Sequence, residues 1–333
     1  MKIAILYKTT LFIILIKILS INLVYGHTNN DEFNIWLISF KKAALTKGIS
    51  KETLNVALRN VKFLEDVIKY DRTQPEFYED TLTYVRKRAT ESRAKIARKL
   101  LKENRILLDE IEKKFDVEKE ILLSLWGIET NFGKHVGKMD IISSLATLSF
   151  DKRRSKFFSQ QLIILLKLID KKLVNHKELY GSWAGAYGNF QFMPSTINKY
   201  AIDYDGNNKI ELKKSLEDSL ASAANYINKI GWKKGQPCFY RVKVTNIIKE
   251  KYLNSSARKI SNKLKISKWK KKGIVSYDGT ELESNLKAAL IVPDNKPNTP
   301  TFLVFSNYEK ILKWNRSLRF GISVCTLANM IKI

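Results

Sequence analysis

The chain has 333 residues, of which 44% are hydrophobic, and its formal net charge at pH 7 is +26. This length and composition allow a substantial buried core in one to three domains, so a disordered chain is not expected. A charge this high makes nucleic acid the first partner to consider, but signs of export at the N-terminus argue against it. The lysines either cover the surface without further function or attract an anionic polymer.

The first residues are typical of an export signal. Lys2 and Lys8 give a positive start, residues 11–24 are mostly apolar, and small residues at 24 and 26 fit a cleavage site after Gly26. Lys17 interrupts the apolar run, which leaves a retained N-terminal membrane anchor as an alternative. No cysteine stands directly after the run, so lipid attachment at a mature N-terminal cysteine is not indicated. No later stretch is long and apolar enough to span a bilayer.

Helical patterns follow as far as the middle of the chain. Apolar residues recur at helical spacing from Phe33 to Ala44, Gly48 is a plausible C-cap, and Ser50 can cap the next helix. Residues 84–115 continue the helical pattern in a heavily charged background.

The pattern changes twice in the second half. Residues 181–196 are rich in glycine and aromatic residues, which favours a loop that brings backbone close to a ligand. From about Pro237, short apolar runs at 239–244, 274–277, 289–292 and 302–305 predict a small sheet, and residues 322–331 return to helix. Cys238 and Cys325 either form a bridge or remain as two buried thiols, and their spacing does not decide.

Glu129 carries the strongest chemical signal. Leu122, Leu125 and Trp126 precede it by seven, four and three residues, so its carboxyl lies on the apolar face of a predicted helix. A lone carboxylate in that place is costly unless it is paired or neutral. Burial therefore favours a raised pKa for Glu129.

The expected ends of this helix strengthen the argument. Asp116 is expected to cap its start, and Gly133 and Gly137 are expected to end it, which leaves Glu129 within the last turn. The negative end of the helix dipole disfavours a carboxylate at that point, so the pKa of Glu129 is expected to rise further. A glutamic acid that stays protonated near neutral pH can protonate a glycosidic oxygen.

A purely structural role for Glu129 is the alternative, with Arg153 or Arg154 as its partner. An ordinary glycosidase also needs a second carboxylate. Asp140 is the nearest candidate in sequence, but helix capping is the favoured role for it.

Several motifs, in order and at fitting spacing, resemble the membrane-bound lytic murein transglycosylase B family from about residue 33 to the C-terminus. The matching signatures are Gly127–Gly133, Ser144–Phe150 with the following Arg153-Arg154 pair, and Gly181–Ser195. Further matches lie at 33–48, 74–77, 224–226, 231–232, 302–304 and 314–317. The resemblance implies a mainly α, α+β fold: a lysozyme-like helical core, an additional helical domain and a small antiparallel β domain. The corresponding ranges are a signal peptide at 1–26, an N-terminal helical domain at 27–112 completed by the C-terminal helix 320–333, a catalytic core at 113–235, and the β domain at 236–319.

The resemblance also implies the reaction. Peptidoglycan strands are cleaved at the β-1,4 bond between N-acetylmuramic acid and N-acetylglucosamine, and the products carry 1,6-anhydromuramic ends. Glu129 matches the single catalytic glutamate of the family, which acts first as acid and then as base. No second carboxylate is demanded, because the acetamido group of the substrate is thought to stabilise the developing cation. No cofactor is required for this chemistry.

Further site residues follow from the matched motifs. Ser182 and Gln191 match positions that bind the sugar near the scissile bond, and Tyr226 and Asn315 match other active-site positions. Tyr187, Phe190 and Phe192 could line a sugar subsite, with core packing as the alternative. Trp314 and Phe320 stand where tyrosines are common in the family, so hydroxyls that help to orient the acid or the substrate are expected to be missing.

A second motif begins at Asp203 and resembles the start of a calcium loop. Asp203, Asp205, Asn207 and the backbone carbonyl of Lys209 alternate as oxygen ligands, although Asn208 replaces the usual glycine. Comparison with the family places the last carboxylate at Asp218. A structural calcium or sodium ion is expected here, with a solvated Asn/Asp turn as the alternative.

The resemblance therefore predicts a periplasmic monomer that acts on peptidoglycan, with cell-wall synthesis or divisome proteins as further partners and no nucleic acid. An inner-membrane anchor facing the periplasm is the alternative location. A catalytically weak peptidoglycan-binding protein and a lysozyme-type hydrolase are the alternative functions. The sequence does not decide between exolytic and endolytic action.

Overall fold

A computed structural model describes residues 29–73, 79–283, 285–296 and 299–332. The predicted signal segment and its cleavage site lie outside these residues. Among the helices in the described ranges, none combines the length and the apolar character that a membrane span requires.

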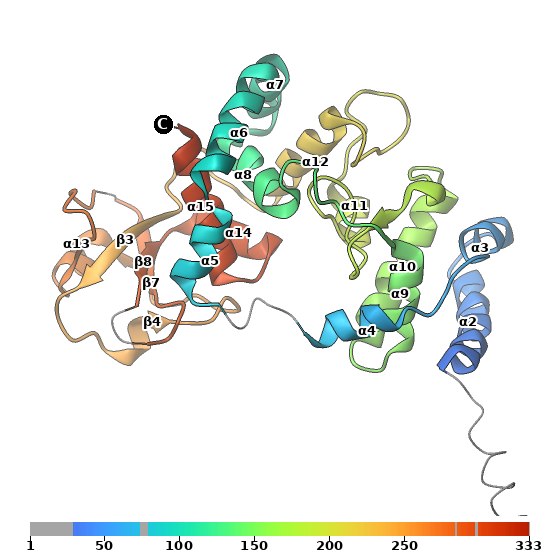
Figure 1. The fold of residues 1–333 in the computed structure, drawn as a ribbon. Coiled ribbons are helices and arrows are strands. Elements are labelled where there is room, and N and C mark those ends of the chain that lie inside the picture. The colour runs from blue at the N-terminus through green and yellow to red at the C-terminus, as the bar shows by residue number, and fades with distance from the viewer. Residues whose placement is uncertain (1–28, 74–78, 284, 297–298, 333) are drawn as a thin grey trace, which may run out of the picture.

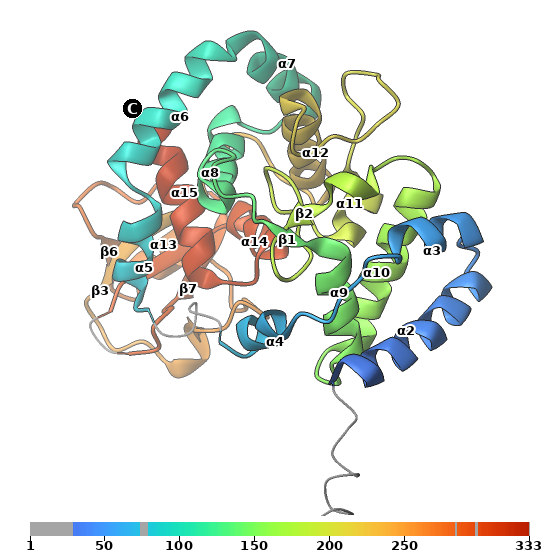
Figure 2. The same cartoon turned by 45° about the vertical axis from the view of Figure 1, so that its right-hand side comes forward.

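The first helices pack against the middle of the chain. Helices α2 (Asn29–Thr46), α3 (Lys51–Ala57) and α4 (Glu65–Arg72) lie against α9 (Ile141–Phe150) and α10 (Ser155–Asp170) (Figures 1 and 2). As predicted, Gly48 follows α2 with a φ of +81°, and the Ser50 hydroxyl caps α3 by accepting a hydrogen bond from the Thr53 amide at 3.1 Å.

The predicted helical stretch 84–115 is divided into three helices: α5 (Thr81–Arg88), α6 (Glu91–Glu103) and α7 (Arg105–Phe115). Both α5 and α6 pack on the C-terminal helix α15 (Leu318–Lys332). The helices that the sequence assigns to one N-terminal domain therefore contact two different parts of the molecule (Figure 1).

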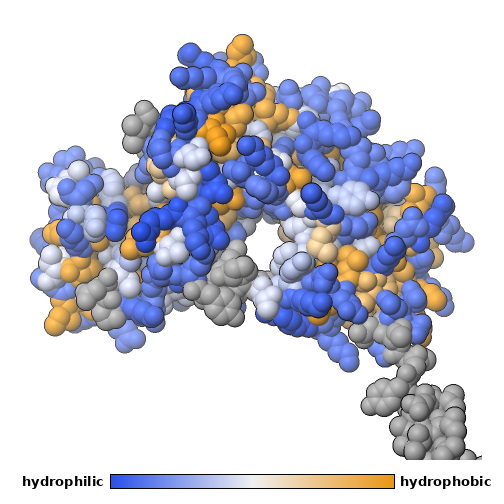
Figure 3. Space-filling view, in the orientation of Figure 1, coloured by the Kyte–Doolittle hydropathy of each residue, from blue (hydrophilic) through white to orange (hydrophobic). Residues whose placement is uncertain are grey.

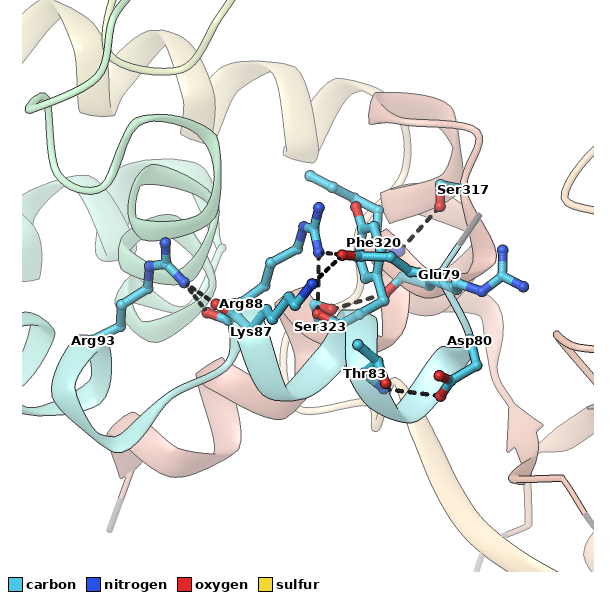
Figure 4. A network of polar contacts seen from close by, with 11 residues as sticks. Glu79, Asp80, Thr83, Lys87, Arg88, Arg93, Ser317, Phe320 and Ser323 are labelled. Atoms are coloured by element: carbon cyan, nitrogen blue, oxygen red, sulfur yellow. Dashed lines mark hydrogen bonds and ion pairs between the residues drawn. The ribbon is translucent and has the colours of Figure 1, made fainter. Parts of the chain in front are cut away.

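Local polar contacts stabilise α5 and the segments directly before and after it. Glu79 accepts hydrogen bonds from Lys87 at 2.6 Å and from Arg88 at 2.9 Å, and Arg93 donates to two backbone carbonyls at the end of α5 (Figure 4). In the same region the Ser317 hydroxyl accepts from the Phe320 amide at 3.2 Å and so caps the start of α15. The first set of contacts is thus local to α5 and its flanks, and the Ser317 contact is local to the start of α15.

The other elements continue the helical core and add the predicted sheet. Helical elements are α8 (Lys119–Thr130), α11 (Pro194–Tyr200), α12 (Leu216–Lys229), α13 (Ile266–Lys270) and α14 (Ser306–Trp314), with 3-10 turns at His176–Glu178 and Glu250–Tyr252. Strands are β1 (Met139–Asp140), β2 (Tyr180–Gly181), β3 (Phe239–Val244), β4 (Leu253–Asn254), β5 (Leu264–Lys265), β6 (Ile274–Ser276), β7 (Lys287–Ile291) and β8 (Thr301–Val304).

The larger sheet has the strand order β4-β7-β8-β3-β6, and β5 also pairs with β7. Its pairings are antiparallel except for the short β4–β7 pair, which is parallel and departs from the wholly antiparallel domain that the family implies. Trp269 of α13 is fully buried among apolar residues of this sheet, and its indole N–H donates to the Ala288 carbonyl at 2.8 Å. The small domain therefore has an apolar core of its own.

The two cysteines form a disulfide, which answers the question that the sequence leaves open. Cys238, directly before β3, joins Cys325 in α15, with 6.1 Å between the two Cα atoms. The sheet is thus covalently attached to the C-terminal helix.

A continuous apolar core runs through the helices. The face of the molecule seen in Figure 3 is largely hydrophilic. The space-filling view also shows a hollow between the part that carries the strands and the part that carries α9 and α10.

Candidate active site

Glu129 lies in the last turn of α8, as predicted, and is partly exposed while most of that helix is buried. The start of the helix differs from the prediction. Asp116 ends α7 in a left-handed conformation with a φ of 55°, and Glu118 occupies the N-cap position of α8. Glu118 accepts hydrogen bonds from the Trp232 indole at 2.6 Å and from a backbone amide at 2.7 Å, so α8 is tied at its start to the end of the helical core.

The chain turns sharply directly after Glu129. Asn131, Phe132 and Gly133 have φ values of 50°, 58° and 82°, so the helix ends before the glycine that the sequence suggested. A left-handed conformation is costly for phenylalanine and is retained only where the surroundings fix it. The Thr130 hydroxyl supplies one such contact, donating to the Asn189 carbonyl at 2.8 Å and accepting from the Gly133 amide at 3.0 Å.

The side chain of Glu129 is held by a residue from the far end of the sequence. The indole nitrogen of Trp314, the last residue of α14, donates a hydrogen bond to Glu129 Oε1 at 2.8 Å. The sequence predicted that the tyrosine hydroxyl common in the family would be missing at position 314. The indole N–H of Trp314 makes a hydrogen bond to the carboxyl group instead. Reasoning from the sequence missed this contact of Glu129 with Trp314, although the departure of residue 314 from tyrosine marked the position.

The two arginines proposed as structural partners of Glu129 are engaged elsewhere. Arg153 Nε lies 2.9 Å from a carboxylate oxygen of Asp71, and Arg154 bonds to the other oxygen of the same group. Arg72 also contacts Asp71, which is almost completely buried. These arginines therefore join α4 to the segment after α9.

Asp140 has the capping role that the sequence favoured. Its side chain accepts a hydrogen bond from the Ser143 amide at 2.5 Å, at the start of α9. Helix capping therefore accounts for Asp140 without giving it the role of a second catalytic carboxylate.

Ser182 and Gln191 both lie beside the segment that follows α8. Gln191 Nε2 donates to the Val136 carbonyl at 3.1 Å, and a Cβ added to Gly137 would lie 2.7 Å from the Ser182 amide nitrogen. The Ser182 hydroxyl accepts from the Ala186 amide at 2.9 Å, which closes the loop on itself. The glycine at 137 is thus required for the close approach of this loop to the active-site segment.

Tyr187, Phe190 and Phe192 are buried, with no more than 5% of each side chain exposed. Their burial favours the core-packing alternative over direct stacking on a sugar. Phe190 and Phe192 present their edges to Trp314, with ring centroids 6.1 and 5.3 Å away. Both rings therefore pack against the indole that donates a hydrogen bond to Glu129.

Tyr226 and Asn315 are brought to the same place by α12 and α14. Tyr226 stacks on Trp314 with centroids 5.0 Å apart, and its hydroxyl donates to the Lys313 carbonyl at 3.0 Å. Burial raises the pKa of Tyr226 to about 12. Asn315 follows Trp314 directly and is half-buried, whereas Phe320 is buried in the core.

Three carboxylates of the predicted calcium loop converge. One oxygen each from Asp203, Asp205 and Asp218 lies within 4.8 Å of the others. Burial raises the pKa of Asp218, while backbone N–H groups of Glu211 and Tyr204 oppose the shift. Such a cluster of hard oxygen donors fits a calcium ion.

The remaining two expected ligands are less clearly placed. The Asn207 side-chain oxygen accepts from the Lys209 amide at 2.9 Å, so that Asn207 closes a local turn. Both residues nevertheless lie in the loop between the converging aspartates.

Comparisons with known proteins agree with this architecture. A family model described as a transglycosylase SLT domain matches residues 32–329. The membrane-bound lytic murein transglycosylase B of Escherichia coli K12 is 40% identical over 122 residues, a match that spans 36% of this chain and about a third (34%) of that protein.

Two solved structures resemble the chain over most of its length. SltB3 from Pseudomonas aeruginosa, in complex with NAG-NAM-pentapeptide, has a TM-score of 0.83 at 32% identity and covers 90% of this chain and 79% of its own. The Escherichia coli lytic transglycosylase Slt35, in complex with calcium, has a TM-score of 0.74 at 26% identity, with coverages of 91% and 93%. From the match of the family model to nearly the whole described region, the chain belongs to the transglycosylase SLT domain family.

Proposed function

We propose that this protein is a lytic transglycosylase that cleaves peptidoglycan strands between N-acetylmuramic acid and N-acetylglucosamine. The observation that carries the proposal is the partly exposed Glu129 at the end of α8, held by Trp314 and flanked by the loop with Ser182 and Gln191. Family membership and the NAG-NAM-pentapeptide bound by SltB3 support this substrate class.

The reaction needs one carboxyl group in two protonation states. Glu129 first donates its proton to the glycosidic oxygen, and the bond to the muramic C1 atom breaks. The C6 hydroxyl of the same muramic residue then attacks C1, while the Glu129 carboxylate removes the hydroxyl proton. The product carries a 1,6-anhydro ring and no water is consumed.

Ser182, Gln191, Tyr226 and Asn315 are proposed to bind the sugar and hold its C6 hydroxyl close to C1. An intramolecular attack depends chiefly on such positioning, because the two reacting groups already belong to one molecule. The buried Phe190 and Phe192 support this site by packing against Trp314.

The loop of Asp203, Asp205 and Asp218 is proposed to hold a calcium ion in a structural role, with Asn207 and the Lys209 carbonyl completing its shell. Its three carboxylates supply the hard oxygen ligands that calcium prefers. The calcium present in the Slt35 structure supports this choice of ion. We further propose that the protein acts in the periplasm, where its substrate lies.

Digestion of purified sacculi tests the function. The wild-type protein is expected to release muropeptides with anhydro ends, identified by mass spectrometry, and Glu129→Gln is expected to release almost none. The amide keeps the shape of the side chain but cannot donate and recover the proton. Asp140→Asn is the matched control, because its carboxylate caps α9, and it should retain the activity.

Three outcomes would contradict the proposal. Equal release by Glu129→Gln would exclude Glu129 as the acid. Reducing ends that have gained a water would indicate a hydrolase, and binding to sacculi without any soluble product would indicate a binding protein.

A further inference from the structure

A cavity of about 1100 Å³ lies between the small β domain and the start of α5, and the proposed reaction does not use it. Its lining includes residues of β3 and β4, the strands at the left of Figure 1, and none of the residues around Glu129. Ligand pockets in proteins usually measure about 300–1000 Å³. This cavity, here called the sheet cavity, is therefore large enough for a short peptide.

The sheet cavity lies at the end of one face of the larger sheet. Side chains alternate between the two faces of a strand, so Phe239, Arg241 and Lys243 of β3 share one face. Phe239 packs edge-to-face on Phe302, which belongs to the main apolar core that covers this part of the face. Further along β3, Arg241 is half-buried and Lys243 is exposed, so the cover ends there.

Part of the wall of the sheet cavity is apolar although it faces solvent. Leu82 of α5, Val244 of β3 and Leu253 of β4 come from three separate elements, and each is 39–40% exposed. Tyr277, directly after β6, adds an aromatic ring that is 44% exposed. Apolar side chains that gather at a concave surface favour a bound partner, because the partner removes them from water.

The charge of the lining has one sign. Arg241, Lys243 and Lys296 line the sheet cavity, and its lining contains no aspartate or glutamate. Within the described ranges, none of these three cations forms an ion pair with a carboxylate of the chain, whereas Arg319 nearby in sequence pairs with Asp294. The sheet cavity is thus complementary to an anionic ligand.

Tyr277 holds the arginine in a fixed place. The guanidinium carbon of Arg241 lies 3.6 Å from the centroid of the Tyr277 ring, and the Tyr277 amide donates to the Arg241 carbonyl at 3.0 Å. Arg241 Nε is buried and has no hydrogen-bond partner among the described residues, so solvation does not satisfy it. A guanidinium that is oriented but lacks a counter-ion is preorganised for a carboxylate, which its planar fork binds through two parallel hydrogen bonds.

These features discriminate between classes of ligand. A neutral sugar would stack on an open aromatic face, but the guanidinium of Arg241 already covers a face of Tyr277. A small inorganic anion would use the cations and leave the aliphatic wall in contact with water. An acidic peptide satisfies both parts of the lining, because its carboxylates pair with the cations and its small aliphatic side chains cover the apolar wall.

We propose that the sheet cavity binds the acidic peptide attached to N-acetylmuramic acid in peptidoglycan, with Arg241 and Lys243 as its carboxylate partners. The choice of this particular peptide rests on the proposed function, which places the protein on peptidoglycan. A contact outside the catalytic site gives the protein a second attachment to the polymer and raises the effective concentration of glycan strands around it.

Calorimetric titration with the free tetrapeptide, released from sacculi by an amidase, tests the proposal. Lys243→Glu changes an exposed side chain and should weaken Kd roughly tenfold or more, because it places a like charge beside the peptide carboxylates. Arg241→Gln should weaken Kd roughly ten- to a hundredfold, as for the loss of a hydrogen bond to a charged group. Lys114→Gln is the matched control: this lysine lies 4.4 Å from the Tyr204 ring, outside the sheet cavity, and Kd should stay unchanged.

Modified ligands complete the test. Amidation of the peptide carboxylates should weaken binding roughly tenfold or more, and added salt should weaken binding of the unmodified peptide. An unchanged Kd in both Lys243→Glu and Arg241→Gln, or equal binding of the amidated peptide, would overturn the proposal. Displacement of the peptide by an equal concentration of inorganic phosphate would indicate a simple anion site, and displacement by a peptide-free glycan would indicate a sugar site; either result would overturn it as well.

Failure of the proposed function is recognised separately. The free peptide has no glycosidic bond, so its titration reports on the sheet cavity without any turnover. Digestion of sacculi by Glu129→Gln as fast as by the wild type would contradict the proposed function, whatever the affinity for the peptide.

Discussion

Removal of the disulfide between Cys238 and Cys325 should destabilise the protein strongly. The bond closes a loop with a sequence separation of 87 residues between the start of β3 and α15. The chain-entropy relation for a loop of this length gives about 4.6 kcal/mol at 25 °C, because the cross-link restricts the unfolded chain. For a cooperative unit of about 300 residues, that loss lowers Tm by roughly 7 °C.

Differential scanning calorimetry can separate the cross-link from side-chain packing. Wild-type protein is measured oxidised and after complete reduction, with the thiol content confirmed by mass spectrometry, beside the double variant Cys238→Ala, Cys325→Ala. Reduction should lower Tm of the wild type by the full amount and leave the double variant unaffected. The variant should lie slightly below the reduced wild type, because Cys325 is buried and alanine leaves a small cavity.

The magnitude makes the reasoning easy to refute. A fully reduced wild type whose Tm falls by less than about 1 °C would show that the loop entropy is not released on unfolding. A double variant that is sensitive to reductant would show that the thermal shift comes from something other than this bond.

Four further predictions concern stability and the cation loop. Asp71→Asn should lower the free energy of unfolding in urea by about 2 kcal/mol, because three arginines then lose a buried carboxylate, and an unchanged midpoint would contradict this. Gly181→Ala should cost about 1–3 kcal/mol in the same assay, since its Cβ would lie 2.1 Å from the Ala186 carbonyl oxygen; the idea fails if the variant is as stable as wild type. Hydrogen bonds from Ser276 and Thr280 lower the pKa of Asp278 from 3.8 to about 2, so its stabilising effect is present above pH 3.8 and is lost as the pH falls through about 2. Asp278→Asn should therefore reduce stability at pH 6 and leave it unchanged below pH 2, as measured by chemical denaturation at each pH. Calcium should raise Tm of the wild type but not of Asp218→Asn, and an equal rise in both would exclude Asp218 as a ligand.

Local sequence patterns predicted helices and strands correctly where a residue in its sequence context is typical of a single structural role. Ser50 caps a helix, Gly48 ends one, and the apolar run 239–244 forms strand β3. The prediction that Asp116 caps the start of the next helix was wrong. An aspartate before an apolar helix can equally end the previous helix in a left-handed conformation. The sequence around residue 116 carries no signal that separates these two uses.

The place of Glu129 in the last turn of a helix was predictable, but its hydrogen bond to Trp314 was not. Glu129 stands out because a carboxylate interrupts an apolar helical face, a pattern visible within one helix. Its hydrogen bond to Trp314 spans 185 positions and depends on how α14 packs on α15 and how α15 packs on α8, which helical spacing does not describe. The parallel pairing of β4 with β7 escaped prediction for the same reason, since strand direction is set by long-range topology.

The distance in sequence between Glu129 and Trp314 also bears on when activity can appear during synthesis. The ribosome makes the acid long before the indole that holds it, and α15 and its disulfide partner come later still. A nascent or truncated chain that stops before residue 314 has Glu129 without this donor. Under the proposed function, such a chain is expected to be a poor catalyst until its last helices have been made.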